Sequence, residues 1–135
     1  MYHSTMIGFA LWLAAAPALP MQQAPTPCEI AADPELLWKQ EGRRLTVTGS
    51  YDWEIHHGFV RPDGCKDDVI FVGFTSPAYA QIDSFLRTTY PGINFGGGSV
   101  WGTFTGVMTI GREGPPYLMI DTIVLDPVRR MTIGN

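Results

Sequence analysis

The densest group of side chains able to do chemistry lies in the middle of the chain. It consists of Asp52, Glu54, His56, His57, Arg61 and Asp63. On an extended strand Asp52, Glu54 and His56 share one face, which places three potential metal ligands side by side. However, the pattern of two histidines four residues apart on a helix is missing, and the adjacent His56 and His57 point to opposite faces of a strand. We therefore interpret the group as exposed polar side chains that can contact a ligand, and we predict no metal site.

Covalent catalysis finds no support in the sequence. A serine nucleophile on a strained turn requires the pattern Gly-x-Ser-x-Gly, which does not occur. The glycine run at residues 96–98 lacks the Lys-Ser/Thr step of a phosphate-binding loop. We predict no catalytic residue and no cofactor. The alternative is a small metal-binding protein or metal-dependent enzyme that uses Asp52, Glu54, His56 and His57.

Composition and charge restrict the partners. The chain has 135 residues, of which 16% are charged, with 15 Gly and 11 Pro. This length suits one domain, and many turn-forming residues with few charges favour a compact β protein. The 9 basic and 13 acidic residues give a formal net charge of -4 at pH 7. Because this charge opposes phosphate backbones, we expect no nucleic-acid partner.

The N-terminal segment has the pattern of a secretory signal peptide. Residues 6–20 carry no charged side chain and lead into small residues, with candidate cleavage sites after Ala18 and after Ala24. Prolines interrupt the end of this apolar run, which is shorter than the roughly 20 residues of a membrane-spanning helix. We expect residues 1–24 to be removed, no permanent membrane span, and a periplasmic or secreted mature protein.

The two cysteines, Cys28 and Cys65, are predicted to form a disulfide bond. An exported chain meets an oxidising compartment, where an even number of cysteines favours pairing. Metal ligation is disfavoured because neither cysteine belongs to a Cys-x-x-Cys pair. The bond would connect the N-terminal linker to a turn at residues 62–65.

Two long strands are predicted from strict alternation of apolar and polar residues, at residues 45–55 and 100–110. Gly49 takes the place of an apolar residue in the first of them, which predicts a bulge or a sharp bend. Shorter strands are predicted at residues 57–61, 69–74 and 117–125. Ser76-Pro77 begins a helix that Pro91-Gly92 ends, and Asp33-Pro34 begins a short one.

The predicted order after the short N-terminal helix is therefore β-β-β-α-β-β. The predicted units are a signal peptide at residues 1–24, a linker with a short helix at 25–42, a strand domain at 43–126 and a flexible tail at 127–135. Three successive strands, one helix and two further strands give a mainly β protein.

The segments LTVTGSYDWEIHHGFVRPDGC and VWGTFTGVMTIGREGPPYLMIDTIVL resemble the first and last strand pairs of OB-fold-like domains in small exported bacterial proteins. The resemblance rests on a Val-x-Gly-x-Tyr start and a Gly-x-Phe-x-Gly fourth strand, and it covers roughly residues 36–126. It implies a five-stranded OB-like Greek-key barrel with one helix between the third and fourth strands. No activity comes with it, because a fold alone does not determine function.

On an OB-like barrel, ligands usually bind the face of the second and third strands, between the loops that follow the first and fourth strands. In this chain those loops are residues 54–58 and 111–116. The predicted binding residues are Glu54, His56, His57, Arg61 and Arg112. Their mixed charge suits a protein or saccharide ligand in the cell envelope, so we expect a non-catalytic binding or interaction module. A structural subunit of an envelope assembly is a further alternative.

Overall fold

The computed structural model describes residues 24–54, 58–89, 92, 97–126, 129 and 132–134. The expected signal peptide therefore lies outside the described residues except for Ala24, and so do His56 and His57. Within the described part of the chain, no helix is long and apolar enough to cross a membrane.

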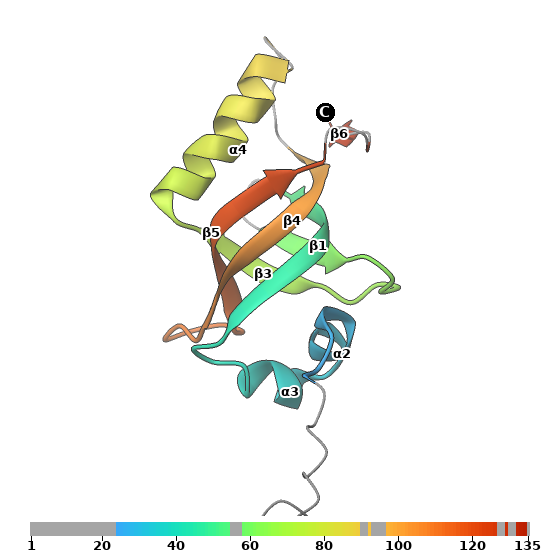
Figure 1. Cartoon of the computed structure of the whole chain (residues 1–135), viewed down its shortest axis with the longest axis vertical. Coiled ribbons are helices and arrows are strands. Elements are labelled where there is room, and N and C mark those ends of the chain that lie inside the picture. Colours follow the sequence, from blue (N-terminus) through green and yellow to red (C-terminus); the bar gives the residue numbers. More distant parts are fainter. Residues whose placement is uncertain are drawn as a thin grey trace, which may run out of the picture.

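Strands dominate the fold, and the helices lie at its ends (Figure 1). The helices are α2 (Pro27–Ala32), α3 (Pro34–Trp38) and α4 (Ser76–Thr89), and the strands are β1 (Arg44–Trp53), β2 (Gly58–Pro62), β3 (Ile70–Phe74), β4 (Gly97–Thr109), β5 (Tyr117–Leu125) and β6 (Thr132–Gly134). The prediction of a mainly β fold with a helix between the third and fourth strands is therefore confirmed.

The strands form one mixed sheet in the order β1-β2-β3-β5-β4-β6, and β1 also pairs with β4. β3 and β5 are parallel, whereas the other paired strands are antiparallel. β1 pairs with β2 on one edge and with β4 on the other edge. Following the paired strands from β1 through β2, β3, β5 and β4 therefore leads back to β1. The second half of β1, from Gly49 onward, is paired on both edges.

Gly49 is the first β1 residue paired on both edges, with Pro62 of β2 and Gly102 of β4. A Cβ atom at this position would overlap the carbonyl group of Arg61. The register of β1 is regular on both sides of Gly49, and a register shift lies instead where β4 pairs with β5. The glycine is thus required because two strands approach closely, and no bulge is involved.

The apolar core lies on the inner face of the strands and is covered at one end by α4. Its buried members are Val47, Val60, Ile70, Ala78, Ile82, Leu86, Phe104, Met108, Leu118, Ile120 and Ile123. Those from α4 recur every four residues, so one stripe of the helix packs on the strands. Figure 1 shows α4 beside β5 at the top, with α2 and α3 at the bottom.

Side-chain caps begin the two N-terminal helices. Asp33 Oδ1 accepts hydrogen bonds from the backbone N–H groups of Glu35 at 3.0 Å and Leu36 at 3.4 Å. Asp33 is thus the N-cap of α3, as the sequence indicates, and Pro34 occupies the first turn. α2 is an additional helix in the segment predicted as a linker, with Thr26 as its N-cap.

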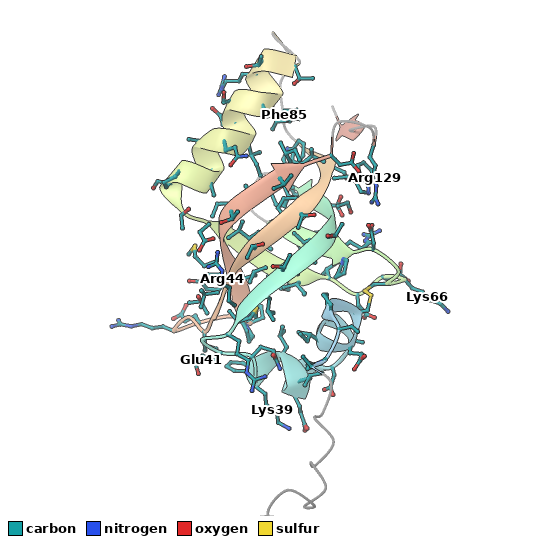
Figure 2. The ribbon with its side chains drawn as sticks, in the orientation of Figure 1. Lys39, Glu41, Arg44, Lys66, Phe85 and Arg129 are labelled. Atoms are coloured by element: carbon teal, nitrogen blue, oxygen red, sulfur yellow. A yellow bond between two sulfur atoms is a disulfide. The ribbon has the colours of Figure 1, made fainter. Side chains whose placement is uncertain are left out.

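The predicted disulfide is confirmed. Cys28 of α2 and Cys65 are bonded, with their Cα atoms 5.4 Å apart. Figure 2 shows the bond beside the turn that carries Lys66, next to α2. The bond therefore fastens α2 to the turn between β2 and β3, and Ile30 of the same helix is buried.

The C-terminal segment contacts the strands at two places. Arg129, labelled in Figure 2, forms ion pairs with Asp63 at 2.9 Å and with Asp126 at 3.3 Å. Farther along, β6 pairs antiparallel with the first three residues of β4. The segment predicted as a flexible tail thus contributes a short strand to the sheet.

Candidate functional site

Four side chains lie in one row across four neighbouring strands, on the outer face of the sheet. Asp52 of β1 is directly opposite Ser99 of β4 and Phe59 of β2, and Phe59 is directly opposite Phe71 of β3. The residues next to them in the chain, such as Val60, point into the core, so the four point outward. We call Ser99, Asp52, Phe59 and Phe71 the cross-strand row.

A groove of about 460 Å³ lies along part of this row. It is lined by Asp52, Trp53, Glu54, Phe59, Arg61, Gly97, Gly98 and Ser99. Gly97 is two residues from Ser99 on β4, and a Cβ atom there would lie 3.3 Å from the carbonyl oxygen of Trp53. We call this cavity the β1–β2–β4 groove. It combines carboxylates, a guanidinium, a hydroxyl and aromatic rings within one open surface.

Asp52 is held in place by its neighbours on the same face. Ser99 Oγ donates a short hydrogen bond to Asp52 Oδ1, and Ser50 Oγ lies 3.5 Å from Asp52 Oδ2. Arg61 Nη2 lies 3.9 Å from the same Oδ2. Only 19% of the Asp52 side chain is exposed. The carboxylate is therefore a fixed acceptor at the base of the groove, which lowers the entropy lost when it binds a ligand.

Arg61 supplies donors beside that acceptor. Its side chain is 45% exposed, and its guanidinium makes one long ion pair, to Asp52, among the described residues. A guanidinium carries five N–H donors in a planar fork, so most of them point away from this single contact. Arg61 and Phe59 lie two residues apart on β2 and thus share the outer face. The donors of Arg61 are available to a molecule that rests on Phe59.

Behind the groove, Tyr51 joins the row to the core. Its ring contacts those of Trp53, Phe74 and Phe104, with centroids 5.8, 4.9 and 6.2 Å away. Burial, and secondarily the nearby phenol of Tyr79, raises the pKa of Tyr51 to about 12. The phenol is therefore neutral at physiological pH. This packing makes the end of β1 rigid where it carries Asp52.

The five predicted binding residues have different positions. Glu54 and Arg61 both line the groove. His56 and His57 lie outside the described residues. Arg112 is exposed in the turn between β4 and β5, beyond the end of the β1–β4 ladder that begins with Arg44 and Val107. Glu54 follows the other end of that ladder, roughly 30 Å away along the strand. The structure thus brings Glu54 and Arg61 together but not Arg112.

The sequence analysis did not select the members of the cross-strand row as binding residues, and all of them except Phe71 line the groove. Alternation within each strand predicts which of its side chains face outward. The row depends in addition on the register between strands that are far apart in the chain, such as Asp52 with Ser99. A single sequence carries no direct signal for that register.

No metal centre is apparent in the described part of the chain, where no group of three His, Cys, Asp or Glu side chains is arranged to hold an ion. Asp52 and Glu54 are two such groups in one groove, but the neighbouring histidines are outside the described residues. The groove as described is thus suited to hydrogen bonding and stacking.

Comparisons of this chain with family models, with curated proteins and with solved structures gave no match.

Proposed function

We propose that this chain is an exported, OB-like binding module that holds its ligand in the β1–β2–β4 groove and performs no chemical step on it. The observation that carries the proposal is the cross-strand row. It aligns a fixed carboxylate and a hydroxyl with two aromatic rings on the outer face. Ligand sites commonly combine apolar or aromatic surface with a few fixed polar groups.

The strand pairings support the OB-like barrel in this proposal. β1 pairs with both β2 and β4, β3 pairs in parallel with β5, and α4 precedes β4. A first strand shared between two pairings is the feature that closes a five-stranded OB barrel. The ligand-binding face of such barrels is that of the second and third strands, where Phe59, Arg61 and Phe71 lie.

Export is supported by two features. The uncharged apolar run at residues 6–20 has the character of a signal peptide. The Cys28–Cys65 bond is of a kind that persists in oxidising compartments and is rare in the cytosol. Residues 25–135 are therefore proposed to work outside the cytoplasm.

Affinity capture from the cell-envelope fraction of the source cell tests this function. The bait is the oxidised chain from residue 25, compared with its Arg61→Ala and Arg112→Ala variants. We expect the unchanged protein and Arg112→Ala to retain the same ligand. The amount retained by Arg61→Ala should be about tenfold lower, because that change removes charged hydrogen-bond donors. Equal retention by all three proteins would overturn the groove as the site. A chemically altered ligand would overturn the non-catalytic assignment.

A further inference from the structure

We propose that the ligand of the β1–β2–β4 groove is a neutral oligosaccharide. The inference rests on the proposed binding function and specifies its ligand class. It follows from three properties of the groove and of the cross-strand row that runs beside it: adjacent acceptors and donors, neighbouring aromatic rings, and nearly balanced charge.

The first property is the arrangement of acceptor and donor. Asp52 Oδ2 and Arg61 Nη2 are 3.9 Å apart, and the exposed Glu54 lines the same groove. A matching ligand must donate to a carboxylate and accept from a guanidinium at neighbouring positions. Hydroxyl groups can do both, since each has one donor and two acceptor lone pairs. Adjacent hydroxyls on a sugar ring thus satisfy Asp52 and Arg61 together.

The second property is the aromatic pair. Phe59 and Phe71 are direct cross-strand neighbours on the outer face, and Phe71 is 40% exposed. Opposed residues on adjacent strands carry their side chains on the same face, so the two rings are neighbouring apolar groups on the outer surface. The C–H face of a pyranose ring can rest on such a surface while its hydroxyls turn to Asp52 and Arg61. From Ser99 to Phe71 the row crosses three inter-strand spacings, roughly 14 Å, which accommodates more than one sugar unit.

The third property is charge. The groove carries the carboxylates of Asp52 and Glu54 and the guanidinium of Arg61. One cation beside two anions repels a polyanion, as does the net charge of -4 for the whole chain. A basic peptide would bring cations beside the half-exposed Arg61 guanidinium, which already faces Asp52 at 3.9 Å. A neutral ligand avoids both conflicts.

The experiment is a titration of the oxidised chain from residue 25 with neutral tetrasaccharides of glucose, N-acetylglucosamine, galactose and mannose, followed by tryptophan fluorescence. Trp53 lines the groove and reports on its occupation. We expect saturable binding of at least one tetrasaccharide. Its affinity should change by less than about twofold between low salt and 0.5 M salt, because no net charge is neutralised.

The variants test the assigned contacts. Phe59→Leu keeps an apolar side chain but removes the flat ring, and Arg61→Ala removes the donors. Each substitution is expected to lower the affinity for the tetrasaccharide about tenfold. Arg112→Ala, at the other end of the ladder, should bind like the unchanged protein. Circular dichroism and melting of each variant show whether the fold is retained.

Tetralysine and a heparin tetrasaccharide serve as charged comparators. The inference is overturned if no neutral tetrasaccharide binds, or if binding is unaffected by both groove substitutions. It is also overturned if a charged comparator binds more tightly and is released by salt. In that last case, binding that still depends on Arg61 would leave the proposed groove function intact. If the binding of every probe is independent of Arg61, both the oligosaccharide inference and the proposed function of the groove are overturned.

Discussion

At the scale of single residues, the Asp52 carboxylate is positioned both by the strand register and by a neighbouring side chain. The register places Asp52 between Ser99 and Phe59, and the Ser99 hydroxyl then fixes one carboxylate oxygen. This arrangement requires that β1 pair with two strands at once. The position at which that double pairing begins is Gly49, where a missing side chain lets the carbonyl of Arg61 approach. Gly49 thus supports the placement of both Asp52 and Arg61.

We predict that Gly49→Val destabilises the protein much more than Thr48→Val. The added side chain would overlap backbone atoms of β2, which costs roughly 1–3 kcal/mol or more when strands must separate. Thr48 lies on the outer face, where its hydroxyl is 3.0 Å from that of Thr103. Its replacement removes one exposed hydrogen bond, worth about 1 kcal/mol or less. Thermal melting compares the two, and similar losses would contradict the role given to Gly49.

At the scale of elements, β5 contains the irregularity that β1 lacks. Thr105 pairs with Thr122 and Gly106 with Ile120, so Asp121 is an extra residue in β5. Asp121 is exposed at this bulge, and Arg44 of β1 reaches across β4 to it with two hydrogen bonds of 2.8 Å. The pair connects β1 with β5, two strands that do not pair directly. Figure 2 labels Arg44 near the lower end of the strands.

We predict an acid-dependent contribution of Asp121 to stability. Hydrogen bonds from Arg44, and then from Thr122 Oγ1, lower the pKa of Asp121 to about 2. Because the unfolded-state pKa is about 3.9, the contribution is present above that pH and is lost as the pH falls toward 2. The melting temperature of Asp121→Asn should therefore be lower than that of the unchanged protein at pH 6, and the difference should shrink as the pH falls from about 4 toward 2.

Asp83→Asn is the matched control, since it removes an exposed carboxylate that pairs with Arg87 within α4. Pairs four residues apart on an exposed helix contribute only about 0.3–0.5 kcal/mol. We expect a smaller difference in melting temperature for this variant at pH 6. A pH-independent difference for Asp121→Asn would contradict the ion-pair explanation.

The sequence predicts elements better than the relations between them. Alternation over residues 45–55 correctly assigns Asp52 to the outer face of β1, and 117–125 coincides with β5. The alternation does not reveal the bulge at Asp121. Asp121 and Thr122 are both polar residues of kinds that occur on the outer face of any strand, so neither marks an extra residue. The sequence analysis also placed Arg112 and Glu54 in one binding surface, because the loops that carry them lie beside the ligand on an OB-like barrel. Their separation follows from the long antiparallel ladder of β1 and β4, which only the pairing shows.

At the scale of the whole molecule, both terminal segments are fastened to the turn between β2 and β3. The disulfide holds α2 there through Cys65, and Arg129 pairs with Asp63 in the same turn. The disulfide is covalent, whereas the ion pair is exposed and screened by salt. The N-terminal attachment should therefore contribute more to stability than the C-terminal one.

We predict that Cys28→Ser/Cys65→Ser lowers the free energy of unfolding by roughly 3–4 kcal/mol, the chain-entropy value for a loop of 37 residues. Denaturant unfolding of the variant and of the reduced, unchanged protein measures this loss. Arg129→Ala is the control, with an expected loss of about 1 kcal/mol or less. Labelling of both cysteines by an alkylating reagent in denaturant without reductant would contradict the bond itself.

The position of the disulfide along the chain also affects the order in which the molecule can be assembled. The loop closed by Cys28 and Cys65 contains α2, α3, β1 and β2 and nothing that follows them. A chain that emerges N-terminus first can thus complete this bond while α4, β4 and β5 are still behind it. The long ladder between β1 and β4, with its large sequence separation, cannot form until β4 has emerged. The position of the bond thus allows oxidation before closure of the sheet, so that the last strands can dock on a covalently fixed first half.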